Sequence, residues 1–233
     1  MEQFKEKIGK KCPELTELQQ EQFENYKDLL LEWNEKINLT AITEEDDIIL
    51  KHFIDSMTIL KHVDEKSSIV DVGTGAGFPG IPVKIANPSI NVTLVDSLNK
   101  RLIFLEEVIK NLNLEKIKTV HSRAEEFGQN NIYREKFDIA TSRAVANLSV
   151  LVEYLLPLVK VGGKCICMKG SDIEEELQNS KDAIKTLGGQ IEKIEEFTLP
   201  ESDIKRNIIV IKKIKKTPNK YPRKPGVPSK DPL

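Results

Sequence analysis

Asp71-Val-Gly-Thr-Gly-Ala-Gly77 is the stretch that identifies the fold, because a short apolar run, Ser68–Val72, leads into it and a helical pattern, Ile81–Ala86, follows it. The glycines of this stretch allow the backbone to turn sharply and to approach a ligand without a side-chain clash. A glycine-rich turn between a strand and a helix is typical of nucleotide-binding α/β proteins. We therefore expect a nucleoside-containing ligand at this turn.

The chain on both sides of the turn predicts a three-layer, Rossmann-like α/β fold. Short apolar runs alternate with helical segments, which is the signature of a mostly parallel sheet with helices on both faces. Seven strands are predicted, the last two as a pair at the end of the sheet: Ser68–Val72, Asn91–Val95, Ile117–His121, Phe137–Thr141, Gly163–Met168, Gln190–Leu199 and Asn207–Ile214. Helices are predicted at Ile81–Ala86, Lys100–Leu112, Asn147–Val159 and Asp172–Leu187.

The residues before the first strand have a helical pattern. Apolar residues recur with a period near 3.6 over Leu15–Lys36, and Thr43-Glu-Glu-Asp46 fits a capping box that begins a second helical stretch, Asp47–Val63. Prolines follow the last strand, and because proline has no amide proton we expect an extended arm that lies over the body or awaits a partner. The chain is thus divided into an N-terminal helical extension packed on the core, a ligand-binding domain and a basic, proline-rich arm, at residues 1–63, 64–216 and 217–233.

Two ligands fit the turn, a dinucleotide and S-adenosylmethionine. Gly75-Ala-Gly-Phe-Pro-Gly80 satisfies the dinucleotide spacing, but the Asp71 carboxylate would repel a pyrophosphate. The same carboxylate suits a cofactor that carries an ammonium and a sulfonium group, and only one nucleotide-binding half is present. Asp96, about 20 residues after the loop, is placed to accept hydrogen bonds from ribose hydroxyls in either case. These features favour S-adenosylmethionine over the dinucleotide.

Composition narrows the class of protein. A hydrophobic content of 39% indicates a folded domain, and no apolar run reaches the roughly 20 residues of a membrane span. The N-terminal residues are charged and lack the apolar centre of a secretory signal. Cys12, Cys165 and Cys167 are too few and too unevenly spaced for a disulfide framework or a zinc site. We therefore expect a cytoplasmic protein with no metal ion and no membrane contact, and nothing demands more than a monomer.

Charge is distributed unevenly along the chain. Ten Lys or Arg and no acid fall between Lys205 and Lys230, so the net charge of −2 leaves −12 for the rest. A basic end on an acidic body points to a nucleic-acid partner, with a solvated tail as the alternative. The residues expected to contact RNA phosphates here are Lys212, Lys213, Lys215, Lys216 and Arg223.

Several motifs are shared with one family along nearly the whole chain. The most specific are Gly77-Phe-Pro-Gly80, Ser142-Arg-Ala144 and Tyr221-Pro-Arg223, and further matches include Trp33-Asn34, Asn38–Ile42, His52, Asp55-Ser56 and Lys169-Gly170. In these motifs the sequence resembles the bacterial 16S ribosomal RNA guanine-N7 methyltransferases, also called glucose-inhibited division protein B. The resemblance implies a class I S-adenosylmethionine-dependent methyltransferase, with 16S ribosomal RNA in the small subunit or its assembly intermediate as partner.

The resemblance also implies cofactor-contacting positions. Gly73, Phe78, Ala124, Glu125 and Arg143 match the positions at which the family contacts its cofactor. Together with the acids and the remaining loop glycines, the predicted cofactor-binding residues are Asp71, Gly73, Gly75, Gly77, Phe78, Asp96, Ala124, Glu125 and Arg143. His52 is interpreted as a helix-face or core histidine.

The acceptor chemistry agrees with methylation at N7. Guanine N7 has an available lone pair and no proton, so its attack on a sulfonium methyl needs no general base. Amino-group methyltransferases follow the fourth strand with a polar-Pro-Pro-aromatic motif, whereas Ser142-Arg-Ala144 stands at that place here. Arg123, Arg143 and Lys169 lie at or beyond carboxyl ends of predicted strands, and we expect them to position the RNA through phosphates or guanine O6.

Two other functions stay open on the sequence alone. One is a methyltransferase of the same fold that acts on another RNA or on a small molecule. The other is a nucleic-acid-binding protein that keeps the fold without catalysis. The intact Asp71, Asp96 and loop glycines favour an active enzyme.

Overall fold

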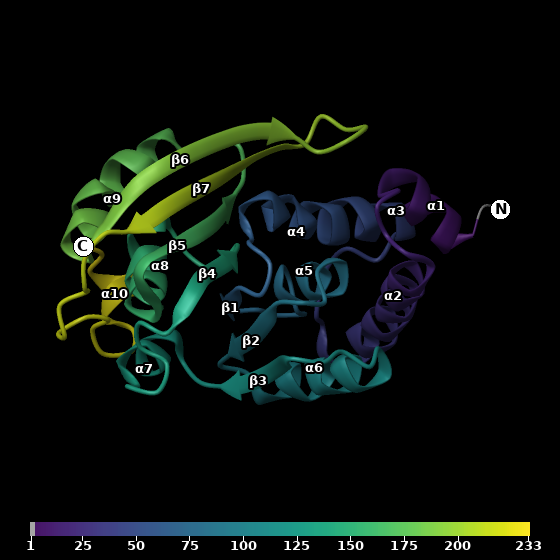
Figure 1. The fold of residues 1–233 in the computed structure, drawn as a ribbon, viewed down its shortest axis with the longest axis horizontal. Helices are drawn as coiled ribbons and strands as arrows, with labels where there is room; N and C mark the ends of the chain where they lie inside the picture. The colour runs from purple at the N-terminus through teal and green to yellow at the C-terminus, as the bar shows by residue number, and fades with distance from the viewer. Residues whose placement is uncertain (1–2) are drawn as a thin grey trace.

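The computed structural model describes residues 3–233, which form a seven-stranded sheet with helices on both faces (Figure 1). The strands lie in the order β3-β2-β1-β4-β5-β7-β6. Strands β1 to β5 are parallel, β7 is antiparallel to β5, and β6 is antiparallel to β7. Their bounds are β1 Ser68–Val72, β2 Asn91–Asp96, β3 Ile117–His121, β4 Phe137–Arg143, β5 Val159–Lys169, β6 Gly189–Thr198 and β7 Lys205–Lys213. The predicted three-layer, mostly parallel, Rossmann-like fold is confirmed.

Two hydrophobic clusters lie on the two faces of the sheet, because successive residues of a strand point to opposite sides. Ile69 of β1 and Ile166 of β5 belong to the cluster under α5 and α6, whereas Val70 and Cys165 belong to the cluster under α7, α8 and α9. The helices are α5 Gly80–Ala86, α6 Asn99–Asn111, α7 Ala124–Gln129, α8 Leu148–Leu155 with a 3₁₀ turn at Leu156–Leu158, and α9 Glu174–Thr186. The short helix α7 was not predicted from the sequence.

The N-terminal residues add a helical layer to the α5–α6 side of the sheet (Figure 1). Its elements are α1 Phe4–Lys11, α2 Glu17–Ile37, α3 Glu45–Asp47, a π-helix at Ile48–Ile54, α4 Asp55–Met57 and a 3₁₀ helix at Thr58–His62. The capping box predicted at Thr43 is wrong, because α3 begins after Glu44 without a side-chain cap. The capping box lies instead at Thr16, whose side chain accepts the Gln19 amide while the Gln19 side chain accepts the Thr16 amide.

Helix α2 braces the glycine-rich loop. The Tyr26 hydroxyl, which is fully buried, donates a hydrogen bond of 2.5 Å to the Ala76 carbonyl oxygen. Gln19 donates to the carbonyl oxygens of Ile85 and Ala86 at the end of α5. The N-terminal layer therefore holds both ends of the loop–helix unit in place.

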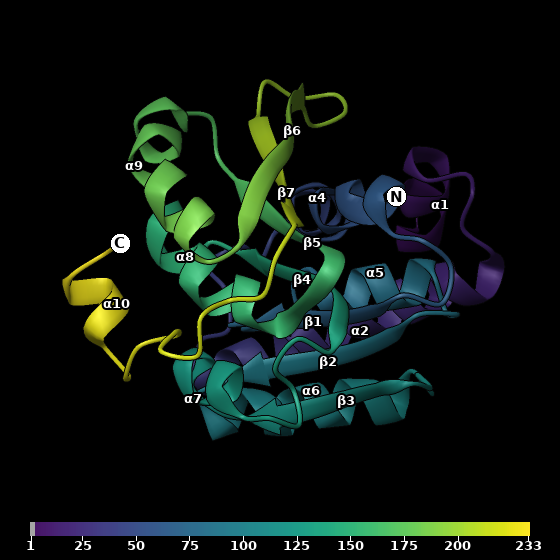
Figure 2. The ribbon, with the colours of Figure 1, turned by 60° about the vertical axis from the view of Figure 1, so that its left-hand side comes forward.

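The C-terminal residues turn back over the body after β7. Figure 2 shows them passing α7 and α8 and ending in α10, Val227–Lys230. Tyr221 is buried in the cluster under α8, and Pro222 packs closely against Gly128 of α7. Of the two arrangements expected for this arm, the structure has the one in which it lies over the body. Among the helices of residues 3–233, none combines the length and apolar content that a membrane crossing requires.

Candidate active site

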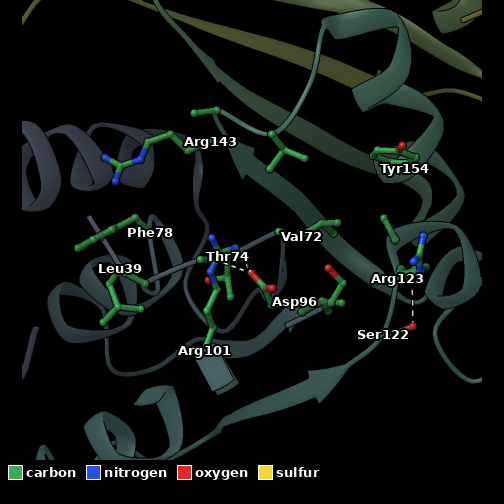
Figure 3. A pocket seen from close by; sticks show the side chains of 18 of the residues that line it. Leu39, Val72, Thr74, Phe78, Asp96, Arg101, Ser122, Arg123, Arg143 and Tyr154 are labelled. Carbon is green, nitrogen blue, oxygen red and sulfur yellow. Dashed lines mark hydrogen bonds and ion pairs between the residues drawn. The ribbon is translucent and has the colours of Figure 1, made fainter. Parts of the chain in front are cut away.

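A cavity of about 640 Å³ opens at the carboxyl ends of β1, β2 and β4, where ligands bind in sheets of this kind. Figure 3 shows Phe78 and Arg143 at one end of this large cavity, Asp96 between the ends, and Arg123 and Tyr154 at the other end. Its volume falls in the range of small-molecule sites, roughly 300–1,000 Å³. Seven of the nine predicted cofactor-binding residues line it: Gly73, Gly75, Phe78, Asp96, Ala124, Glu125 and Arg143.

The glycine-rich loop forms one wall of the large cavity. The amides of Gly73 and Thr74 donate to the carbonyl oxygen of Val95, at 2.8 and 3.1 Å, and tie the loop to the end of β2. Gly75 has a φ of +62°, and an added Cβ would meet only the Gly73 carbonyl oxygen, at 4.0 Å. The backbone is therefore open at Gly75, and a ligand can approach it closely.

Asp71 lies behind this loop rather than in the cavity. Its carboxylate is fully buried, and Oδ2 accepts hydrogen bonds from Thr74 Oγ1 at 2.6 Å and from the Gly80 amide at 3.0 Å. Burial raises the pKa of the Asp71 carboxyl to about 6. The structure thus corrects the predicted direct cofactor contact, because the carboxylate is used to hold the loop against the start of α5.

Gly77 also faces away from the large cavity. Its φ is +102°, and an added Cβ would lie 2.7 Å from the Tyr26 hydroxyl and 2.7 Å from Ile81 Cδ1. The glycine therefore allows α2 to approach the loop. The predicted cofactor contact of Gly77 is corrected to a packing role.

Asp96 lines the cavity and braces the loop from the end of β2. Its Oδ2 accepts the Gly75 amide at 2.9 Å and Arg101 Nη1 at 3.3 Å, and Oδ1 accepts the Leu98 amide at 2.9 Å. A carboxylate has about four acceptor positions. One position is therefore left for a donor in the cavity, such as a ribose hydroxyl.

The far end of the large cavity is formed where β3 leads into α7. Ala124 and Glu125 begin this helix, and Tyr154 of α8 lies across from them. The Glu125 side chain is 7% exposed, whereas Arg123 is exposed and has no side-chain hydrogen bond or ion pair within residues 3–233. Arg123 is therefore the predicted RNA-positioning residue that is free to meet a partner.

Arg143 forms the near end of the cavity and is held on several sides. Its guanidinium donates to the Lys51 carbonyl oxygen at 2.9 Å, to Asp55 Oδ2 at 3.2 Å and to His52 Nδ1 at 3.1 Å. The same group lies 4.8 Å above the ring of Phe78. These contacts leave Arg143 in one orientation, beside the loop.

His52 is a site residue that the sequence analysis interpreted as a helix-face or core histidine. Its ring stacks on Phe78 with centroids 4.3 Å apart, and its Nε2 lies 2.8 Å from Thr40 Oγ1. Burial, and after it the charge of Arg143, lower the pKa of His52 to about 4. Because Nδ1 accepts from Arg143, the neutral ring donates from Nε2 to Thr40. His52 was among the motifs of the resemblance, which is the signal that could have identified it.

A second, smaller cavity of about 350 Å³ adjoins the first. The two share His52, Arg143 and Ala144, so they meet at the end of β4. Its other lining residues include Asp55, Met168, Lys169, Phe197, Arg206, Asn207 and Ile208. Asp55, which sequence reasoning also missed, is 3% exposed and joins Arg143 to Arg206, whose Nε lies 3.2 Å from Asp55 Oδ1.

Lys169 lines the small cavity but its ammonium is already paired. Nζ donates to the Ala146 carbonyl oxygen at 2.7 Å and to Glu176 at 2.5 Å. Contact with an RNA phosphate would require Lys169 to leave Glu176. Residues 3–233 contain no group of three or more His, Cys, Asp or Glu side chains that could hold a metal ion.

The five basic residues near the C-terminus that were predicted to contact RNA lie in different surroundings. Lys213 is fully buried, and its Nζ donates to the Leu156 carbonyl oxygen and to Thr217 Oγ1, so the predicted RNA contact of Lys213 is wrong. The Arg223 guanidinium is bound by Glu153, so contact with an RNA phosphate would require Arg223 to leave Glu153. Lys212 is half-buried, and only Lys215 and Lys216 of this set are exposed.

Comparison with known proteins shows similarity over nearly the whole chain. The family described as rRNA small subunit methyltransferase G matches residues 19–209. "Ribosomal RNA small subunit methyltransferase G" of Acetivibrio thermocellus is 60% identical over 94% of this chain and 90% of that protein, and that of Alkaliphilus metalliredigens is 57% identical over 92% and 91%. The solved structure of "M. jannaschii TYW2 in complex with AdoMet" aligns over 69% of this chain and 75% of that chain, with a TM-score of 0.55 and 14% identity. The last likeness shows the fold alone.

Proposed function

The chain belongs to the rRNA small subunit methyltransferase G family, and from this membership we propose that it methylates N7 of one guanine in the RNA of the small ribosomal subunit. It is an S-adenosylmethionine-dependent methyltransferase by family and by fold. The observation that carries the proposed acceptor is that two cavities meet at Arg143 and Ala144.

The large cavity fits the methyl donor. The open backbone at Gly75 gives room for the amino-acid end of the cofactor, and Asp96 has an acceptor position for its ribose. Glu125 at the far end can accept hydrogen bonds from the adenine amino group. Bound there, S-adenosylmethionine supplies an electrophilic methyl group on a sulfonium.

The small cavity fits the acceptor base. Apolar side chains of Met168, Phe197 and Ile208 offer surface for a flat ring, and Asp55 and Asn207 offer polar groups at its edge. A base inside a helix cannot reach such a cavity, so the guanine must be flipped out or already unpaired. The shared wall at His52 and Arg143 would bring N7 to the end of the large cavity where the methyl group lies.

Methylation at N7 requires no proton transfer by the residues at the shared wall. Guanine N7 uses its lone pair to form the new C–N bond while the S–C bond breaks, and the positive charge passes from sulfur to the guanine ring. His52 is neutral near pH 7 because its pKa is about 4, and it holds Arg143 rather than acting as a base. Aligning the two reactants can lower the barrier by on the order of 7–11 kcal/mol.

The RNA partner would meet the exposed basic residues around the cavities. Arg123 lies at the far end of the large cavity, and Lys215 and Lys216 follow β7. We propose that a monomer in the cytoplasm acts on 16S ribosomal RNA in the small subunit or its assembly intermediate. In this proposal residues 1–63 support the catalytic domain, 64–216, and residues 217–233 form a distinct C-terminal unit.

The test is to incubate the protein with methyl-labelled S-adenosylmethionine and small subunits that lack the modification, beside naked 16S RNA, and to map the label. We expect one labelled guanine whose base is released by the borohydride and aniline chemistry specific for N7-methylguanine. Label at a ring carbon or an exocyclic amine would overturn the N7 assignment. Saturable cofactor binding without transfer to either RNA would favour a different acceptor.

A further inference from the structure

The C-terminal residues contact two residues that line the large cavity. Residues 221–229, which we call the strap, cross α7 and α8 (Figure 2). Hydrogen bonds join the strap to Glu125 and Tyr154. Both of these residues line the far end of the cavity. The strap is therefore in contact with the cofactor site, although it is distant from it in sequence.

The start of the strap is anchored to the body by hydrogen bonds and an ion pair. The Arg134 guanidinium donates to the carbonyl oxygens of Tyr221, Thr217 and Pro218 at 2.7 to 3.2 Å. Gln129 of α7 donates to the Pro222 carbonyl oxygen at 2.7 Å.

Arg223 adds a charge-assisted attachment. Its Nε and Nη2 bind the two oxygens of Glu153 at 3.0 and 2.8 Å, and its amide donates to the same carboxylate at 2.7 Å. Glu153 is fully buried and lies next to Tyr154 in α8. This two-point pairing fixes the strap at the base of the cavity wall.

The end of the strap binds the cavity residues themselves. The Gly226 amide donates a 2.9 Å hydrogen bond to Glu125 Oε1, and Ser229 Oγ lies 3.1 Å from the Tyr154 hydroxyl. Gly226 has a φ of +82°, which L-amino acids rarely adopt, and nothing lies within 4 Å of an added Cβ. Gly226 is thus required for its backbone conformation and not for lack of space.

We propose that the strap positions Glu125 and Tyr154 for the adenine of the cofactor and so sets both the affinity and the base selectivity of this site. The inference rests on the proposed function, because it takes the large cavity as the adenosyl site. With the methyl group at the Arg143 end and the ribose at Asp96, adenine would lie at the Tyr154 end (Figure 3), which Glu125 also lines. A fixed carboxylate accepts from the adenine amino group and repels the carbonyl oxygen of a hypoxanthine ring. Gly226 is a positioning residue, since it acts through Glu125.

Two substitutions of Gly226 distinguish the effect of losing its amide donor from the effect of adding a side chain. Gly226→Pro removes the amide donor and forces φ near −65°, whereas Gly226→Asn keeps the donor and tolerates the left-handed conformation. Calorimetric titration with S-adenosylhomocysteine should show about tenfold weaker binding for Gly226→Pro, the equivalent of 1.4 kcal/mol, and near wild-type binding for Gly226→Asn. The preference for this ligand over its inosine analogue should shrink for Gly226→Pro only.

A double-mutant cycle with Glu125→Ala tests whether the strap acts through that carboxylate. In the Glu125→Ala background, Gly226→Pro should cost little further affinity. An undiminished loss in that background, or wild-type affinity and selectivity for Gly226→Pro, would overturn the proposal. If Gly226→Pro does not fold by its thermal transition, Ser229→Ala replaces it, with an expected loss of about threefold from the Tyr154 hydrogen bond. A wild-type protein that binds no S-adenosylhomocysteine would contradict the proposed function instead.

Discussion

The glycine-rich loop and the Glu125–Tyr154 end of the large cavity are built by different kinds of contact. The loop is held largely by nearby residues, because Thr74 and Gly80 bind Asp71 from three and nine residues away. Tyr26 of α2 adds a hydrogen bond to Ala76 from 50 residues away. Glu125 is held by Gly226, 101 residues later, and Tyr154 by a segment that depends on the pairing of Arg223 with Glu153, 70 residues apart. One end of the site is thus held mainly by nearby residues with support from α2, whereas the other end is held by the C-terminal residues.

Basic residues of the C-terminal segment also differ in role, because some bind the body of the protein and others face solvent. Arg223 and Lys216 are both cations near the end of the chain, yet Arg223 pairs with the fully buried Glu153 and Lys216 is exposed. A buried pair loses stability sharply when one partner is removed, because the other charge is left without compensation. An exposed cation affects only partners that arrive from solution.

The largest effect on the free energy of unfolding is expected from removing the ion pair between Arg223 and Glu153. Arg223→Ala leaves the buried Glu153 carboxylate unpaired, and the free energy of unfolding should fall by about 3–5 kcal/mol in urea titration. The double variant Arg223→Met with Glu153→Met should recover most of this loss, since apolar replacements of a buried pair are often neutral. A loss below about 1 kcal/mol for Arg223→Ala would show that the strap is not fixed by this pair.

The next effect concerns the local brace, Asp71, and depends on pH. The pKa of this carboxyl is about 6 in the folded protein because of burial, against roughly 4 in the unfolded chain. The folded state holds the proton more tightly, so the contribution of Asp71 to stability is present below pH 4 and is lost as the pH rises through 6. Asp71→Asn removes this titration while an amide oxygen can still accept from Thr74 and Gly80.

The unfolding free energy of the wild type relative to Asp71→Asn should therefore decline between about pH 4 and 6, by roughly 3 kcal/mol at most. Urea titrations of both proteins at several pH values measure the difference. A difference that rises with pH over this interval would mean that the buried carboxyl has a lowered pKa instead.

Strands and the loop could be predicted from the sequence because their signals are local. The alternation of apolar runs and helices gave all seven strands within a few residues, and the glycine spacing gave the loop. Asp71 was predicted in the right place with the wrong role, because sequence does not show that Thr74 and Gly80 occupy its carboxylate. Strand position is a short-range property, whereas the direction of a side chain depends on its partners.

The site residues that were missed or misassigned depend on long-range packing. His52 and Asp55 reach the site only because a π-helix and α4 pack beside the end of β4. Arg143, their partner on β4, lies 91 and 88 residues later in the chain. Lys213 resembles the neighbouring lysines in sequence. The alternation of β7 nevertheless points its side chain into the core, where Nζ donates to the Leu156 carbonyl oxygen. No count of charges could distinguish Lys213 from Lys216.

A smaller effect is expected from crowding the loop. A Cβ on Gly80 would lie 2.4 Å from Leu94 Cδ2 and 3.0 Å from Asp71 Oδ2. Gly80→Ala should therefore lower the free energy of unfolding by about 2 kcal/mol, as overpacking of a core does. Gly170→Ala is the matched control for stability, because nothing lies within 4 Å of its Cβ. Equal unfolding midpoints for the two variants would mean that the loop can move aside at no cost.

The smallest effect on stability is expected from substitution of the exposed Lys216. Lys216→Gln should leave the urea midpoint unchanged, while the slope of log K against log salt for RNA binding should fall by about 1. Filter binding to small-subunit RNA at several salt concentrations measures this slope. An unchanged slope would remove Lys216 from the RNA contact.

Arg143 joins the two cavities, and its removal tests most directly whether methyl transfer takes place where they meet. Single-turnover transfer of labelled methyl to small subunits should be compared for the wild type, Arg143→Lys and Arg143→Ala, with folding checked by thermal unfolding. We expect Arg143→Ala to remain folded and to transfer at least about 100-fold more slowly, near 2.7 kcal/mol, because the wall of Phe78, His52 and Asp55 loses its common partner. Arg143→Lys should recover only part of the rate, since an ammonium cannot make the two-sided contacts of a guanidinium. Transfer at the wild-type rate by folded Arg143→Ala would place the reaction elsewhere.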